Sequence, residues 1–207
     1  MKTKNNLLAV FALLIASCSD ANNSKNFEVS LHDKPLLEVP VQPRPLPNPD
    51  KNAYFGDLHV HTQNSFDAYT FGTISTPVDA YKYARGHAIQ HPSGYLIQLS
   101  RPLDFYAVTD HGVFMGLMKE AADTTSEFSK YEFTKPLHNL NESGGTGFRD
   151  LIKRGGLFKP FGEKVREGVA DGTIDESLIL EVGRTVWQKT IKAADDAYVP
   201  GTFTTFA

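Results

Sequence analysis

The segment YFGDLHVHTQNSFDAYT concentrates side chains that can bind a metal ion. His59 and His61 are separated by a single residue, Asp57 precedes them and Asp67 follows them. Residues two apart on a β-strand point to the same face, so both imidazoles can reach a single ion. Asp57 shares that face and can hydrogen-bond a ligand histidine from behind. Asp67 falls in the loop after the strand, which can fold back over the site.

A second segment, LDFYAVTDHG, is apolar until it ends in Asp110 and His111. A strand that is apolar on both faces is typical of a buried sheet in an α/β protein. The C-terminal ends of parallel strands face the same side, so the two segments are expected to converge. We expect His59, His61, Asp67 and His111 to be metal ligands, and Asp110 to orient a ligand or accept a proton. A mixed set of His and Asp suits Zn, Mn or Fe better than Ca or Mg.

The neighbouring sequence predicts the elements that hold these segments. STPVDAYKYARG has the signals of a helix, with Ser75 or Thr76 as N-cap, Pro77 in the first turn and Gly86 as the stop. HAIQHPSGYLIQLSRP predicts a loop with a short hairpin, and VFMGLMKEAAD predicts a second helix. The alternation of strand and helix indicates a parallel α/β arrangement.

The second half of the chain is predicted to be mainly helical. Between residues 124 and 172, repeated glycines predict short helical pieces. A long helix is expected from about residue 175 to 197, after a capping box that begins at Thr173. Trp187 and Ile191 are four residues apart and are expected to face the core. The final TFTTFA begins like another strand.

The N-terminus has the pattern of a bacterial lipoprotein. Two lysines and a short apolar run precede Cys18, the only cysteine of the chain, in the sequence IASC. This predicts a lipoprotein signal peptide over residues 1–18 and lipidation of Cys18; an ordinary signal peptide with a chance cysteine is the alternative. Residues 19–52 predict a flexible, proline-rich linker, and residues 53–207 the functional domain. We expect a protein of the cell envelope, lipid-anchored to a membrane and facing the periplasm or the cell exterior.

Composition excludes some classes of partner. The net charge is −3, with 41% hydrophobic and 22% charged residues. These values fit a soluble globular domain, and a chain without a basic patch is not expected to bind nucleic acid.

The two histidine segments resemble a known superfamily. DLHVHT followed by an aspartate, and AVTDHG, resemble the first two motifs of the PHP (polymerase and histidinol phosphatase) superfamily. Over longer stretches, including HPSG and WQKTIKAADDAYVPGTFTTF, the chain resembles the N-terminal part of a bacterial, often exported PHP-like family of unknown function. The resemblance implies a distorted β/α barrel, a multinuclear metal site at the strand C-termini and phosphoester hydrolysis. Matched by position, His59, His61, Asp67 and His111 are ligands, with Asp110 beside the last.

The sequence departs from the PHP pattern after the second motif. It has no histidine after His138 and no later D-x-H motif. About 150 residues follow the linker, whereas a β/α barrel typically has about 250. We therefore expect the N-terminal portion of a PHP-type barrel, incomplete, from a truncated parent.

Two functions remain open at this point. The first is a metal-dependent hydrolase, in which a complete parent uses more than one ion to hydrolyse an unknown small-molecule phosphoester. The alternative is a catalytically inactive, membrane-tethered fragment that binds metal. A purely structural lipoprotein would leave the histidine segments unexplained.

Overall fold

The structure, a computed structural model, describes residues 46, 49, 51–142 and 148–207. Leu36–Ala207 belong to one compact unit. The expected signal peptide with Cys18, and nearly all of the expected linker, lie outside the described residues. Every helix in the described ranges is too short or too polar to span a lipid bilayer.

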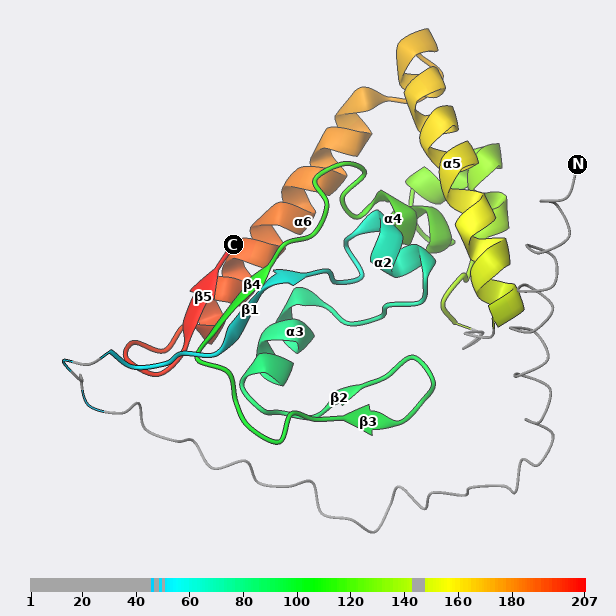
Figure 1. Cartoon of the computed structure of the whole chain (residues 1–207). Coiled ribbons are helices and arrows are strands. Elements are labelled where there is room, and N and C mark those ends of the chain that lie inside the picture. Colours follow the sequence, from blue (N-terminus) through cyan, green and yellow to red (C-terminus); the bar gives the residue numbers. More distant parts are fainter. Residues whose placement is uncertain (1–45, 47–48, 50, 143–147) are drawn as a thin grey trace, which may run out of the picture. The chain divides into compact units, whose positions relative to one another are not determined.

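Three parallel strands form the central sheet (Figure 1). β1 (Gly56–Val60) pairs with β4 (Phe105–Val108), which pairs in turn with β5 (Thr204–Phe206). β4 is the middle strand, and Tyr106, Ala107 and Val108 are buried. The predicted parallel α/β arrangement is confirmed, as is the buried strand of the second segment.

The expected barrel is not confirmed. Among the described residues, β1 and β5 each have one neighbouring strand, so the sheet is open at both edges. A β/α barrel closes with about eight tilted strands, and three strands cannot curve far enough to meet. The described fold is therefore a mixed α/β structure with an open sheet.

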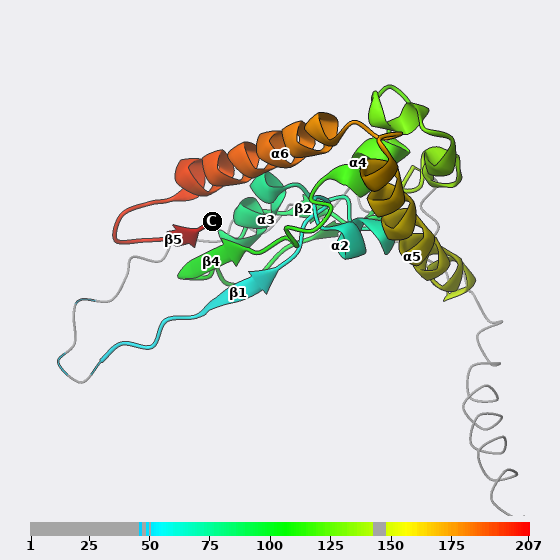
Figure 2. The same ribbon diagram turned by 90° about the horizontal axis from the view of Figure 1, so that it is seen from above.

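Two helices cover one face of this sheet (Figure 2). α3 (Pro77–Ala84) and α6 (Glu176–Ala197) pack on β4 through small and aromatic side chains. The small residues let the helix backbones approach the strands closely. The buried residues of this first core are Ala80, Tyr81, Ala84, Tyr106, Val108, Ala193, Ala194, Ala197 and Phe203.

The other helices form a second core beside the sheet. α4 (Leu117–Ala122) packs against α2 (Phe66–Thr70), the 3₁₀ helices η1 (Phe128–Lys130) and η2 (Glu132–Leu137), and α5 (Phe148–Asp171) joins them. Its buried residues are Leu117, Met118, Ala121, Phe128, Leu137, Phe161, Val165 and Ile174. This core holds α2 against the strand ends, where the site forms.

The local signals around α3 and the hairpin are confirmed. Thr76 caps α3: its hydroxyl accepts a hydrogen bond from Asp79 N, and the Asp79 carboxylate accepts one from Thr76 N. Gly86, at φ 84°, ends the turn after the helix. The hairpin forms between β2 (Ile89–Gln90) and β3 (Leu96–Ile97). α4 begins later than predicted because Gly116 has a left-handed φ of 77°.

Two predictions for α6 are wrong. Its N-cap is Asp175, whose side chain accepts a hydrogen bond from Ser177 N. The backbone N and the hydroxyl of Thr173 both donate to the Asp171 carboxylate in the preceding turn, so Thr173 does not cap the helix. Trp187 and Ile191 are 43% and 37% exposed, because the sheet and α3 accept only the small-residue face of α6.

The predicted break-up of the middle region is confirmed for residues 128–137, which form the short helices η1 and η2, but it is wrong for residues 148–171. α5 runs unbroken from Phe148 to Asp171 through Gly155, Gly156, Gly162 and Pro160. Long-range packing explains this: a methyl group on Gly155 or Gly162 would touch Phe71 or Phe114, so these glycines lie where other aromatic rings approach the helix. Tertiary contacts thus outweigh the low helix propensity of glycine.

Candidate metal centre

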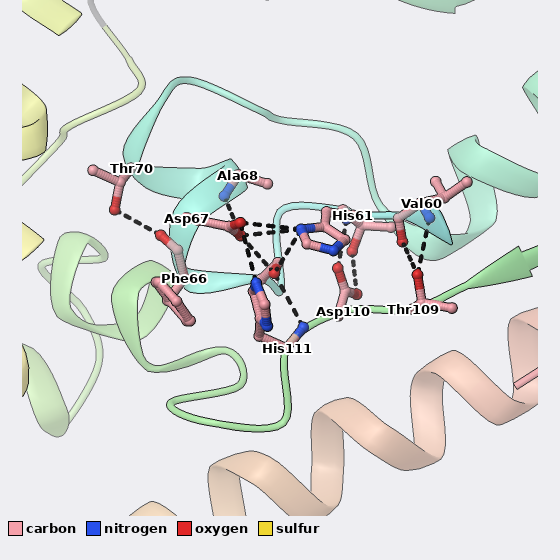
Figure 3. A network of polar contacts seen from close by, with 11 residues as sticks. Val60, His61, Phe66, Asp67, Ala68, Thr70, Thr109, Asp110 and His111 are labelled. Carbon is pink, nitrogen blue, oxygen red and sulfur yellow. Dashed lines mark hydrogen bonds and ion pairs between the residues drawn. The ribbon is translucent and has the colours of Figure 1, made fainter. Parts of the chain in front are cut away.

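Two neighbouring strands bring the histidine segments together at the C-terminal end of the sheet (Figure 3). His61 is the first residue after β1, and Asp110 and His111 follow β4. The strands are parallel, so their C-terminal ends lie side by side. Thr109 joins them, since its hydroxyl accepts a hydrogen bond from Val60 N at 2.9 Å.

His61, Asp67 and His111 form a compact group of potential metal ligands. The Nδ1 atom of His61 lies 3.2 Å from each carboxylate oxygen of Asp67, and Nε2 of His111 lies 3.3 Å from Oδ2 of Asp67. One ligand atom from each residue lies within 4.8 Å of the other two. In the described part of the chain, this is the one group of three or more His, Cys, Asp or Glu side chains that meets this condition.

The donor set and its spacing fit a transition-metal ion. Two imidazole nitrogens and one carboxylate oxygen suit Zn, Mn or Fe better than Ca or Mg. Ligands about 2.1 Å from a tetrahedral ion lie about 3.4 Å from one another. The distances of 3.2 and 3.3 Å from Asp67 to the two histidines are close to that spacing.

Asp67 is held as a carboxylate by its surroundings. Burial alone raises the pKa of Asp67, but hydrogen bonds from Ser65 Oγ and Ala68 N, each 2.7 Å, and the neighbouring His61 bring its pKa below the usual value. Asp67 also lies in the first turn of α2. The side chain is therefore ionised at neutral pH, as a metal ligand must be.

Ser65 connects the three potential ligands, and the sequence analysis did not identify it. Its hydroxyl donates to Asp67 Oδ1, accepts from His111 N at 3.1 Å and lies 3.4 Å from His61 Nδ1. Ser65 is fully buried. The sequence signal for Ser65 is a hydroxyl two residues before Asp67, which can bind the aspartate locally. Its contact with His111 becomes visible only in the folded loop.

The ring of His111 is supported by an aromatic stack. Phe66 of α2 stacks on His111 with ring centroids 4.8 Å apart, and Phe158 of α5 stacks on Phe66 at 4.3 Å. The rings of His61 and His111 meet edge to face at 4.7 Å. The orientation of His111 therefore depends on α5, which is distant in sequence and could not be connected to the site from the sequence.

Asp110 holds the loop that follows β1. Its Oδ1 accepts a hydrogen bond from Thr62 N at 2.5 Å, and its Oδ2 accepts one from Thr62 Oγ1 at 2.7 Å. Burial raises the pKa of Asp110, and the two bonds from Thr62 offset this only in part. Both carboxylate oxygens are thus engaged with the loop and lie outside the group of potential ligands.

His59 and Asp57 lie at the margin of the site. The rings of His59 and His61 are on the same side of the strand, with centroids 5.1 Å apart. His59 is exposed and is not part of the compact group. The carboxylate of Asp57 accepts a hydrogen bond from the main-chain N of His59 at 2.9 Å, so the contact shown is with backbone and not with a ligand ring.

Comparison with known proteins identifies one family. A family model described as "Protein of unknown function (DUF3604)" matches residues 48–207. The searches of curated proteins and of solved structures found no match.

Proposed function

We propose a metal-dependent phosphoesterase activity for this chain, which belongs to the DUF3604 family of proteins of unknown function. The observation that supports this most directly is the group formed by His61, Asp67 and His111, whose ligand atoms lie within 4.8 Å of one another at the ends of two parallel strands. Sites of this kind bind divalent ions that assist hydrolysis.

The choice of phosphoesters rests on the sequence motifs. DLHVHT and AVTDHG resemble the first two motifs of the PHP superfamily, in which characterised relatives hydrolyse phosphoesters. His61, Asp67 and His111 occupy positions of that pattern.

The protein residues have distinct roles in this proposal. His61, Asp67 and His111 hold the ion, while Ser65 fixes the positions of Asp67 and His111. A bound divalent ion supplies polarisation of a phosphoryl oxygen and acidification of a water molecule. His111 is the most open of the three, with 47% of its side chain exposed against 19% for His61, so substrate approaches from the His111 side. His59, exposed beside His61, is available to contact the substrate or a further ion.

A second candidate function is metal binding without turnover. The described residues contain one group of three potential metal ligands, so a second ion would find few side chains to bind it there. A lipid-anchored protein that binds metal at the cell envelope is consistent with this small set of ligands.

One experiment separates the two functions. The full chain is purified, stripped with a chelator and titrated calorimetrically with Zn²⁺ or Mn²⁺, and an aryl phosphate is then offered to the loaded protein. Binding with turnover, both lost in His61→Ala and His111→Ala, supports the phosphoesterase. Binding without turnover supports the second candidate. Failure to bind either ion would refute both.

The matched control is His91→Ala. His91 lies in the hairpin loop, where its ring stacks on Tyr95 at 4.3 Å. Removal of this imidazole should leave metal binding unchanged. A loss as large as that of the ligand variants would show that binding is not specific to the proposed centre.

A further inference from the structure

α6 and its C-cap residue, Tyr198, carry a second apolar stripe that stays exposed. Leu180, Trp187, Ile191 and Tyr198 are 58%, 43%, 37% and 49% exposed. Successive residues are about 100° apart around a helix, so these four fall within about 40° of one another. A stripe of this length with a tryptophan at its middle is unusual on a free surface and is typical of a protein–protein contact.

The stripe lies on the flank of α6 that faces the edge of the sheet. It adjoins Ala194, whose carbonyl accepts a hydrogen bond from Thr205 of the edge strand β5. On the opposite flank, Ala193 lines a groove with Pro77 at the start of α3. Figure 2 shows α6 running above β5. The stripe is therefore turned away from α3, towards the side where β5 has no further described neighbour.

The order of the four residues along the helix is self-complementary. If two α6 helices lie antiparallel about a two-fold axis at position 189, Leu180 faces Tyr198 of the other copy. With the same axis, Trp187 faces Ile191. Both apolar pairs form twice in one register, which is the condition for a symmetric contact between identical chains.

Charges beside the stripe fit the same register. Arg184 and Asp195 lie about 40° and 60° to one side of it, given about 100° per residue. About that axis, Arg184 of one copy lies within roughly one residue rise of Asp195 of the other. Two Arg–Asp pairs therefore flank the apolar contact, whereas a parallel two-fold arrangement would place Arg184 of one copy and Asp195 of the other on opposite sides of the contact.

We propose that this stripe is the interface for a second copy of the chain, which packs α6 against α6 in antiparallel orientation. A helix pair of this length buries less than a standard interface, so we expect a concentration-dependent dimer with micromolar affinity. The proposal does not depend on the metal centre.

The test is sedimentation equilibrium of the full chain in mild detergent, from about 1 to about 100 µM, which brackets the expected affinity. Trp187→Glu should weaken dimerisation roughly thirtyfold, as expected for the central aromatic residue of an interface. Ile152→Glu is the matched control, because Ile152 is 63% exposed on α5, away from the stripe. Circular dichroism verifies that both variants stay folded.

A charge exchange tests the register. Arg184→Asp and Asp195→Arg should each weaken the dimer several-fold, and the double variant should restore it because the opposite charges meet again. Association through the apolar N-terminal segment, or with a different protein, would not be restored. A monomer at all concentrations, a dimer unaffected by Trp187→Glu, equal damage from Ile152→Glu, or a double variant as weak as the single ones would overturn the proposal.

Discussion

Ser65 is the residue that links the three potential ligands to one another. Its buried hydroxyl donates to Asp67 and accepts from the main chain of His111. Asp110, the residue before His111, has the corresponding role for the loop after β1, because it accepts hydrogen bonds from the backbone N and the hydroxyl of Thr62. At this scale the centre is a set of ligands whose positions are set by hydroxyl and carboxylate neighbours, which often matter for metal affinity nearly as much as the ligands do.

Ser65→Ala is predicted to weaken metal binding by about tenfold. The variant removes the bond that orients Asp67 but leaves all three ligands in place. Calorimetric titration with Zn²⁺ measures the effect. Ser129→Ala is the matched control, since Ser129 is also buried and donates to a carbonyl, that of Ser126, far from the ligands. Equal affinity in the two variants would contradict the role given to Ser65.

At the scale of elements, α5 and the strand pair determine the site. α5 reaches His111 through the stack of Phe158 on Phe66. β1 and β4 approach so closely at Gly56 that a side chain there would overlap the carbonyl oxygen and the ring of Phe105. The ligands thus depend on a long helix and on a strand contact that has no room for a methyl group.

Phe158→Ala is predicted to lower metal affinity by roughly tenfold, because Phe66 and then His111 lose their support. Phe161→Ala is the control on the same helix. Phe161 is buried in the second core, so its loss should cost about 3–5 kcal/mol of unfolding free energy. While it stays folded, that variant should lose less metal affinity than Phe158→Ala, because the ring of Phe161 packs on Phe114, Phe128 and Phe133 and is not part of the stack on His111. Calorimetry and denaturant unfolding separate the two effects, and a normal affinity for Phe158→Ala would refute the stack's role.

Gly56→Ala is predicted to lower the free energy of unfolding by about 1–3 kcal/mol, the usual cost of overpacking. In contrast, Gly156→Ala should raise it by about 0.5–1 kcal/mol, because alanine favours helix over glycine. Gly156 lies within α5, and a methyl group there would meet no other atom within 4 Å. Urea unfolding measures both changes. A neutral Gly56→Ala would indicate that β1 and β4 are not paired at Gly56 and Phe105.

At the scale of the whole molecule, stability depends on two cores, of which the first contains buried tyrosines and the second is flanked by partly buried ones. Tyr106 lies in the first core between β4 and α3, where it meets Tyr81 edge to face. Burial, together with nearby Asp57, raises the pKa of Tyr106 to about 12. Burial also raises the pKa of Tyr81 and Tyr69. The folded protein therefore holds phenol protons that the unfolded chain releases at lower pH.

This predicts a loss of stability at alkaline pH. Below about pH 10, the ordinary pKa of tyrosine, both states keep the Tyr106 proton, so the contribution of this group to the free energy of unfolding is fully present. Between about pH 10 and about pH 12 only the folded state keeps the proton. The free energy of unfolding should fall through this window. Tyr106→Phe should make the fall less steep, as measured by urea unfolding at several pH values. An unchanged slope would contradict the burial of this phenol.

The location of the protein is predicted from the sequence alone. We propose that Cys18 is lipidated and anchors the chain to a membrane of the cell envelope. Cys18→Ser should release the protein into the soluble fraction. Fractionation of cells that express the two forms tests this, and retention of the variant on the membrane would disprove the lipid anchor.

Much of the site was predictable because its signals are local. The spacing of His59 and His61, the position of Asp67 after the strand and the Asp110–His111 end of a buried strand each follow from the period of a strand and from strand polarity. The cap at Thr76 and the hairpin are short-range features in the same sense. Such patterns depend on neighbours a few residues away, and they need no knowledge of the rest of the fold.

Other features were decided only by the tertiary structure. Periodicity placed Trp187 and Ile191 in the core, but the sheet and α3 accept the small residues of α6 and leave that stripe exposed. Glycines predicted breaks in α5, but aromatic rings from distant segments pack where those glycines lie. Asp67, rather than His59, joins His61 and His111 because Ser65, which binds Asp67, also accepts a hydrogen bond from the distant His111. In each case the choice depends on contacts between residues far apart in the chain, whose free energies exceed the local preferences that a sequence pattern records.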